Sequence, residues 1–329
     1  MNIQILKTSE ENVESSAKII NFLLLFVALF AISFTPILVK ISTREIGINA
    51  TLFNRLWIVT IIFSFWNSFL WIQFQDKNLE LISEHSDHIA SPNSKIKNFI
   101  KQGGFWIVIV SIFHLSQRFT WTWALTETST ANATVLSNIT PIFTTLGSWL
   151  FLGYQFDRRF IAGLFLSILG AIALGASQVS FSSGGLIGDC AALSAGIFNS
   201  IGSVISQKIR QRLDSSTYLL WRSAFSTLLI IPIVLYFEKT IFPISPLGWF
   251  SVIALALISE AIAHGLVIHS MKHFTASFLS IFFLSQAVVA TLLAWIFIGE
   301  KIGVINCIAL AIIVLGIYLA KTGKGAETK

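Results

Sequence analysis

Long apolar stretches dominate the chain, and short polar connections separate them. A helix needs about 20 apolar residues to cross roughly 30 Å of hydrocarbon, and the stretches Ile19–Val39 and Leu56–Gln75 run that far without a charge. Further apolar stretches follow at Phe105–Leu125, Ala131–Leu152, Phe160–Ser177, Leu186–Ile205, Tyr218–Phe237, Leu247–Ser270, Phe274–Ile298 and Ile302–Ala320. The pattern predicts an all-α integral membrane protein with ten transmembrane helices.

The second half of the chain repeats the first. At an offset of 146 residues, Gly170 matches Gly316, and the segment Ile112–Gly175 overlays Ile258–Lys321. Each copy contains five predicted spans. Because five is an odd number, the second copy must enter the membrane from the side opposite to the one where the first copy begins. The sequence therefore predicts two inverted five-helix repeats. Such repeats are common in secondary transporters, which bind substrate near the midplane where the halves meet.

A change of offset along the chain locates one enlarged loop. Lys40 matches Lys208 at an offset of 168, and the later drop to 146 places about 21 extra residues in Asp76–Gly103. We interpret this segment as a solvated cytoplasmic connection; a regulatory or metal-binding role for His85 and His88 is the alternative. The expected organisation is a tail at 1–18, a first repeat at 19–180, a second repeat at 185–320 and a tail at 321–329.

Basic residues are distributed unevenly between the two sides of the predicted membrane. With a cytoplasmic N-terminus, the cytoplasmic side carries Lys7, Lys18, Lys77, Lys95, Lys97, Lys101, Arg158, Arg159, Lys208, Arg210, Arg212, Lys272, Lys321, Lys324 and Lys329. The opposite side carries Lys40, Arg44, Lys239 and Lys301. The positive-inside rule therefore places both termini in the cytoplasm. The expected location of the protein is the plasma membrane or the inner membrane. The net charge of +6 is explained by these loops rather than by nucleic-acid binding.

The third predicted span carries a polar row. His114, Gln117, Arg118 and Trp121 follow i, i+3, i+4, i+7 spacing and share one helical face. An ionised side chain near the bilayer centre costs about 2.5–3.5 kcal/mol, so this face should point to a cavity or a partner. The Arg118 guanidinium suits a carboxylate or phosphate. Trp121 is either a surface on which an organic substrate stacks or an interfacial anchor.

The eighth predicted span carries a second polar pair in register with the first. Glu260 matches His114 and His264 matches Arg118 at the offset of 146. Equivalent positions of inverted copies lie at similar depths, so His114 is expected to approach Glu260 and form a proton-titratable pair. The alternative is that these residues are buried, satisfied contacts that bridge helices.

Other polar residues extend the candidate lining. They are Thr134, Asn138, Asn199, Ser203 and Gln286. Pro36 and Pro141 fall inside the first and fourth spans, where a missing amide donor should break the helix. Arg55 and Arg222 lie a few residues inside their spans, so they either snorkel to the headgroups or form gates.

A stripe of small residues marks the fifth span. Gly163, Ser167, Ala171 and Gly175 recur every four residues, which permits close helix packing. The expected partner is the tenth span, either within the chain or across a homodimer. Cofactor and enzyme signals are missing from the sequence: it contains no HExxH, GxSxG or P-loop motif, and neither cysteine belongs to a metal-binding spacing.

Several local motifs occur in a characteristic order. They are Arg55 in Leu-Phe-Asn-Arg, the stretch Ala124–Ala131, Pro141 and Gly299-Glu300. With the two halves, they resemble the drug/metabolite transporter (DMT) superfamily, in particular its EamA group with two tandem domains. The resemblance implies alternating access, cytoplasmic termini and frequently export of amino acids or related metabolites. Two positions depart from it: Tyr154 replaces a usual Glu, and Ala287 replaces a frequent Pro.

The sequence thus predicts a secondary transporter rather than an enzyme. It would move a small organic solute by alternating access, with or without proton coupling, and it would need no cofactor. A membrane scaffold or sensor without solute flux is the main alternative. An intramembrane enzyme acting on lipid-linked substrates is a further alternative, for which no cluster of catalytic groups is visible.

Overall fold

The computed structural model describes residues 20–82, 103–128, 130–176, 186–293, 295 and 303–328. These residues contain no β-strand; one isolated bridge joins Phe274 and Glu327. The expected residues His85 and His88 and the pair Gly299-Glu300 lie outside this part of the chain. The helices are residues 20–33, α2 Thr35–Ser42, α3 Ile48–Ile82, α5 Phe105–Glu127, α6 Thr130–Ser137, α7 Thr140–Leu152, α8 Arg158–Ala176, α9 Leu186–Arg210, α10 Ser215–Phe237, α11 Pro246–Ala254, the π-helix η2 Leu255–His264, α12 Gly265–Ser270, α13 Ala276–Phe282, α14 Ser285–Leu293 and α15 Val304–Thr322.

Eight helical segments among the described residues are long and apolar enough to cross a membrane. They are Ile20–Ser42, Ile48–Gln73, Val135–Leu152, Arg158–Gly175, Leu186–Arg210, Ser215–Phe237, Pro246–Ser270 and Val304–Thr322. The other two expected spans coincide with α5, which carries the polar row, and with α13 and α14, which are separate helices. In the second of these regions, residues Ala276–Val289 form a shorter apolar helical segment.

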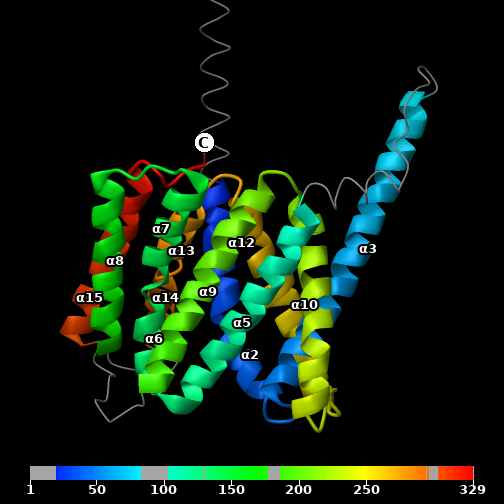
Figure 1. The fold of residues 1–329 in the computed structure, drawn as a ribbon, viewed down its shortest axis with the longest axis horizontal. Helices are drawn as coiled ribbons and strands as arrows, with labels where there is room; N and C mark the ends of the chain where they lie inside the picture. Colours follow the sequence, from blue (N-terminus) through cyan, green and yellow to red (C-terminus); the bar gives the residue numbers. More distant parts are fainter. Residues whose placement is uncertain are drawn as a thin grey trace, which may run out of the picture.

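The helices stand side by side as a bundle (Figure 1). Within it α8 packs along α15, α5 along α9, α3 along α10 and α2 along α11. Helix α3 has 35 residues, which is about 52 Å at 1.5 Å per residue, and its end projects from the bundle (Figure 1). The loop expected from Asp76 therefore begins later, because the helix continues to Ile82.

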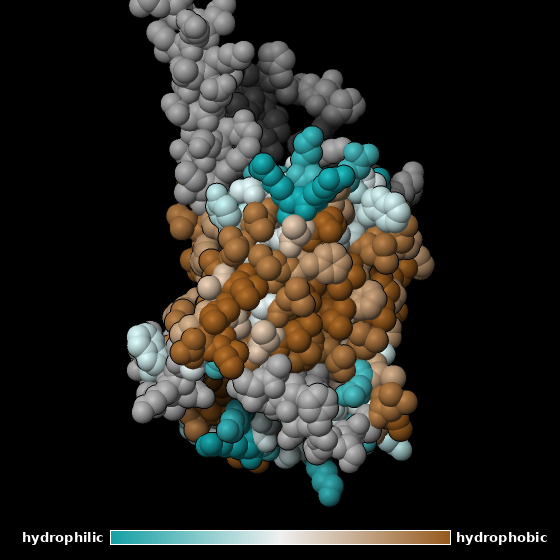
Figure 2. Space-filling view, turned by 90° about the vertical axis from the view of Figure 1, so that its left-hand side faces the viewer, coloured by the Kyte–Doolittle hydropathy of each residue, from teal (hydrophilic) through white to brown (hydrophobic). Residues whose placement is uncertain are grey.

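A hydrophobic belt crosses the face of the bundle that α8 and α15 form. The face formed by α8 and α15 shows a broad band of hydrophobic residues with hydrophilic residues above and below it (Figure 2). Phe165, Leu169, Leu315 and Tyr318 are each more than half exposed on these two helices. Soluble proteins rarely expose a contiguous apolar surface of this extent. The belt and the apolar helices together describe a multi-pass membrane protein.

The proline breaks occur where the sequence places them. Pro36 and Pro141 occupy the first turns of α2 and α7, directly after interruptions at Phe34 and at residues 138–139. A further interruption at Phe283 and Leu284 separates α13 from α14. Leu284 is the repeat equivalent of Asn138, so the helix break before Pro141 recurs in the second repeat. It recurs although Ala287 stands at the position equivalent to Pro141. No proline in this segment predicts the second break.

Helices α8 and α15 pack through the expected small residues within one chain. A Cβ added to Gly163 would lie 2.4 Å from the backbone nitrogen of Ala320. A Cβ added to Gly316 would lie 2.5 Å from the backbone nitrogen of Ser167. Only glycine permits such close backbones. The small-residue stripe of α8 therefore packs against α15 of the same chain rather than against a second copy. Gly175 is the exception, because it faces Val135.

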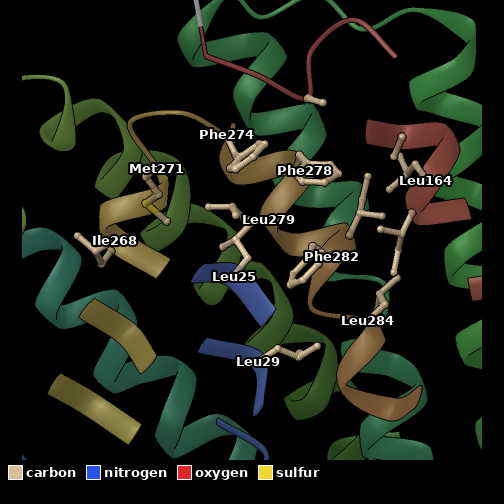
Figure 3. Close-up of a cluster of buried hydrophobic side chains, with 14 of the residues drawn as sticks. Leu25, Leu29, Leu164, Ile268, Met271, Phe274, Phe278, Leu279, Phe282 and Leu284 are labelled. Atoms are coloured by element: carbon tan, nitrogen blue, oxygen red, sulfur yellow. The ribbon is translucent and has the colours of Figure 1, made fainter. Parts of the chain in front are cut away.

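A large apolar cluster joins the two ends of the sequence (Figure 3). Phe274, Phe278 and Phe282 from the region of α13 are at most 2% exposed and pack with Leu25 and Leu29 of the first helix. Phe282 also makes an edge-to-face contact with Phe22, with ring centroids 5.8 Å apart. The first helix of the chain is thereby fixed against the second repeat.

Candidate functional site

The centre of the site is one buried carboxylate. Glu260 is 1% exposed, and its Oε1 lies 2.7 Å from Nη2 of Arg118 and 3.0 Å from Nη2 of Arg55. Its Oε2 lies 3.2 Å from Nη2 of Arg222. These side chains come from α3, α5, α10 and η2. Burying ions in a protein interior is tolerated when they are paired in this way.

The two carboxylate oxygens face different halves of the chain. Oε1 pairs with Arg55 and Arg118 of the first half, whereas Oε2 pairs with Arg222 of the second. His264 lies on the Oε2 side, with its Nδ1 3.8 Å from that oxygen. Arg55 and Arg222 are repeat equivalents, as are Arg118 and His264. The carboxylate is thus shared between matched positions of the two halves.

A π-helix carries this carboxylate. The segment Leu255–His264 is wound as a π-helix, and such turns occur frequently at functional sites. The hydroxyl of Thr35 donates to the Ser259 hydroxyl at 2.9 Å, which links the segment to α2. Nδ1 of His264 lies 2.7 Å from the Ser259 carbonyl oxygen. Because a carbonyl only accepts, Nδ1 carries a proton and Nε2 remains available to the cavity.

The contacts bear on two expectations, the pairing of His114 with Glu260 and the placement of Arg55 and Arg222. Glu260 pairs with arginines, whereas the ring of His114 packs against Gly202: a Cβ there would lie 3.3 Å from its Nε2. No ion pair between His114 and Glu260 occurs in the described structure. Arg55 and Arg222 do not snorkel, because both are buried on the carboxylate. Ion pairs with Glu260 hold both arginines in the interior.

A cavity of about 370 Å³ lies beside this ion-pair cluster. Most of the polar residues selected from the sequence line it, although they come from distant segments. They are His114, Gln117, Arg118, Asn138, Asn199, Ser203, Arg222, His264 and Gln286. The helix breaks at residues 137–141 and 283–284 also reach this wall. We call this space the central cavity.

A second cavity, of about 600 Å³, extends from the same cluster toward the end of α2. Arg55, Trp121 and Lys40 belong to its lining, and we call it the outer cavity. Trp121 therefore faces a cavity, whereas Trp123 is 52% exposed on the bundle surface. Both cavities share Ile32, Gln117, Arg118 and His264.

The structure adds polar lining residues that the sequence analysis missed. Ser137 lines the central cavity, and its Oγ is buried without a hydrogen-bond partner among the described residues. Thr35 and Ser259 line the outer cavity. Hydroxyl groups are common in transmembrane helices, so only their position beside a helix break could have singled them out. The side chain of Thr134 lies outside the described part of the structure.

Beyond the central cavity, polar contacts join helices at the end of the bundle opposite to the end of α2. Oε1 of Gln207 accepts from the backbone nitrogen of Ala276 at 2.8 Å, and Nε of Arg210 donates to the Ile268 carbonyl at 2.9 Å. The hydroxyls of Ser206 and Tyr218 lie 2.6 Å apart. These buried bonds join α9 and α10 to the region of α12 and α13.

At the end of α2, two carboxylates join the connections between helices. Glu45 accepts from the backbone nitrogen of Ser245 at 2.6 Å and from its hydroxyl at 2.5 Å. Glu238 accepts from the backbone nitrogen of Asn49 at 3.0 Å, at the start of α3. Each carboxylate lies at the N-terminus of a helix from the other half, where unpaired amides favour an anion. Hydrogen bonds to Ser245 and Ile244 lower the pKa of Glu45 below its ordinary value.

An apolar multi-span bundle with a polar, charged cavity at its centre is the architecture of a membrane transporter. The comparisons agree with this class. Residues 19–176 and 186–322 both match the model of the EamA-like transporter family. The chain belongs to that family, in two tandem copies, and is a membrane transporter of the DMT type.

The fold is also similar to that of a protein known from a crystal structure. The TM-score is 0.68 at 19% sequence identity, and the match covers 91% of this chain and 96% of the other. At this identity the likeness concerns the fold alone. No curated protein matches the chain.

Proposed function

We propose that the protein is a secondary transporter that moves a small organic solute with a carboxylate or phosphate group by alternating access. Arg118 is the proposed contact for this anionic group. The observation that carries the proposal is the cluster of three arginines on one carboxylate, placed at the wall shared by two cavities.

The charge of this cluster favours an anion. Three guanidinium groups face one carboxylate, so two positive charges remain uncompensated in a buried region. Arg118 is the most accessible of the three, with 22% of its side chain exposed. A bound anion can pair with its remaining donors, since a guanidinium carries five N–H groups. An amino acid or a related metabolite supplies such a carboxylate.

The helix pairings support ten spans in two inverted repeats. When the two repeats are exchanged, α5 corresponds to α11 with η2, and α9 corresponds to the first span. Helix α5 contacts α9, and the first span contacts α11 and η2, so both equivalent pairs occur. The contact of Ser167 with Gly316 maps onto that of Ile313 with Gly170, and both occur. Equivalent contacts of this kind are expected for two copies related by a pseudo-two-fold axis.

The cavities support a conformation that is accessible from the end of α2. The outer cavity reaches Lys40 and Thr43, whereas Gln207 and Arg210 close the opposite end. We infer from the distribution of basic residues that the closed end and both termini are cytoplasmic, in the plasma or inner membrane. The structure would then represent an outward-facing state. Export as the direction of transport rests on the family resemblance.

Proton coupling is a second proposal, and the contacts favour histidine as its carrier. Protonation of Glu260 would leave three arginines without their carboxylate, which is costly in a buried site. His264 reaches both cavities and keeps Nε2 free for a proton. A pH gradient would then drive transport through His264 or His114.

Proteoliposomes loaded with a broad metabolite mixture test these proposals. The expected result is faster loss of carboxylate- or phosphate-bearing solutes than from protein-free liposomes, measured by mass spectrometry with and without a pH gradient. Solute loss equal to that of protein-free liposomes would contradict transport and favour a scaffold or sensor. Loss of neutral solutes alone would contradict the anionic substrate. A rate insensitive to the pH gradient would remove proton coupling.

A further inference from the structure

A third cavity opens on the outside of the bundle, between α7 and α9. Its volume is about 390 Å³, and it shares no lining residue with the central or outer cavity. The walls are apolar side chains such as Leu146 and Leu150 of α7 and Ile197, Ile201 and Val204 of α9. We call it the lateral groove.

One end of the lateral groove is basic. Lys208 in the last turn of α9 and Arg212 in the turn after it line this end. Both side chains are exposed, and this end of α9 lies on the same side of the bundle as the C-terminus (Figure 1). Trp106, at the start of α5, lines the groove as well. Tryptophan and basic residues are typical of the depth at which a helix meets the lipid headgroups.

We propose that the lateral groove binds one anionic phospholipid from the leaflet on the C-terminal side. An acyl chain would lie against Leu150 and Ile201, and the headgroup phosphate would lie between Lys208 and Arg212. Basic pockets between transmembrane helices recognise such headgroups. The apolar walls fit a hydrocarbon chain, and the paired cations match a phosphate. The proposal requires only that the protein spans a bilayer, and it is independent of the transported solute.

The residues of the lateral groove differ from their repeat equivalents. Lys40 and Arg44 are the equivalents of Lys208 and Arg212 on the opposite side, but Lys40 lines the outer cavity instead. Gly147 forms part of the groove floor, where an added Cβ would lie 3.2 Å from Cγ2 of Val204. Its repeat equivalent is Leu293. A glycine in α7 therefore provides depth that a leucine would fill.

Retention of lipid by the purified full-length protein tests the proposal. The protein is equilibrated with equal amounts of phosphatidylglycerol and phosphatidylcholine, and bound lipid is counted by native mass spectrometry. We expect preferential retention of phosphatidylglycerol. The double variant Lys208→Ala/Arg212→Ala should reduce this preference roughly tenfold, because each basic residue near the surface adds a favourable term for anionic lipid. The matched control, Arg158→Ala/Arg159→Ala, removes two charges outside the groove on the same side of the bundle. This control should keep the preference for phosphatidylglycerol.

A second variant tests the hydrocarbon part of the groove. Leu146→Trp places a larger side chain in the groove without changing charge, whereas Leu169→Trp changes an exposed leucine of α8. We expect lost retention for the first and unchanged retention for the second. Equal retention by wild type and Lys208→Ala/Arg212→Ala, an equal loss in the arginine control, or full retention by Leu146→Trp would each overturn the proposal.

Discussion

Helix α5 and the π-helix η2 carry matched positions of the two sequence repeats, but they differ in winding and in charge. In the first repeat His114 and Arg118 lie on the regular helix α5. In the second, Glu260 and His264 lie on the π-helix η2. The flanking arginines, Arg55 and Arg222, are the same in both halves. The repeated residues thus build a symmetric cationic frame, and the single carboxylate makes the site asymmetric.

The largest effect is expected from removal of the shared carboxylate. Glu260→Gln keeps the size of the side chain but leaves three buried arginines without a counter-ion. Loss of one partner of a buried ion pair costs about 3–5 kcal/mol. We expect a large decrease in the thermal unfolding temperature of the purified protein and loss of solute flux. An unchanged unfolding temperature would show that the carboxylate does not hold the two halves together.

The exchange variant His114→Glu/Glu260→His sharpens this result. It moves the carboxylate to the equivalent position of the first repeat. Because α5 has no π-turn and position 114 packs against Gly202, we expect little recovery relative to Glu260→His alone. Full recovery of the unfolding temperature would show that the two positions are interchangeable and would contradict the asymmetry.

The equivalent arginines provide the next test. Arg55→Met and Arg222→Met each remove one contact to a different oxygen of Glu260. Each arginine lies within ion-pair distance of the buried carboxylate, so both variants should lose stability by a similar amount, about 1.5–3 kcal/mol as for other contacts to a charged group. Chemical or thermal unfolding in the same detergent measures both. A large loss for one variant and none for the other would break the proposed equivalence.

Close packing of α8 and α15 predicts a smaller pair of matched effects. Gly163→Ala and Gly316→Ala each place a methyl group within 2.6 Å of atoms in the opposite helix, so the helices must separate. Overpacking of this kind costs about 1–3 kcal/mol. The control Gly265→Ala adds a methyl group in a helix where the nearest atom, Cδ1 of Leu219, would lie 3.8 Å away, so its stability should not fall. If solute flux and stability were unchanged in both packing variants, the tight α8–α15 contact would be contradicted.

The smallest expected effect is a pH dependence at the end of α2. Hydrogen bonds from Ser245 and Ile244 lower the pKa of Glu45 from its ordinary value of 4.5. Because the pKa is lowered on folding, the stabilisation is present above pH 4.5 and is lost as the pH falls below it toward the folded-state pKa. The difference in unfolding temperature between wild type and Glu45→Gln should therefore shrink on acidification. A difference that grows at low pH would contradict this sign.

The sequence predicted the helices and most lining residues, because apolar length and helical spacing are local properties. It also located the breaks at Pro36 and Pro141, where the missing amide acts locally. The partners of Glu260 could not be predicted in the same way. Helical spacing identifies the shared face of His114 and Arg118 but not which of them reaches Glu260 from another helix. The π-winding of η2 likewise has no proline or glycine signal within the segment.

The concentration dependence of solute flux in Arg118→Met proteoliposomes tests the central proposal most directly. Arg118 pairs with Glu260 but is also the most accessible of its three arginines and lies at the wall of both cavities. With the solute identified by the metabolite screen, we expect at least a tenfold rise in KM, since about 1.4 kcal/mol corresponds to a factor of ten. Protein recovered in the vesicles and its unfolding temperature control for folding. An unchanged KM in a folded variant would contradict the assignment of Arg118 as the contact for the anionic group.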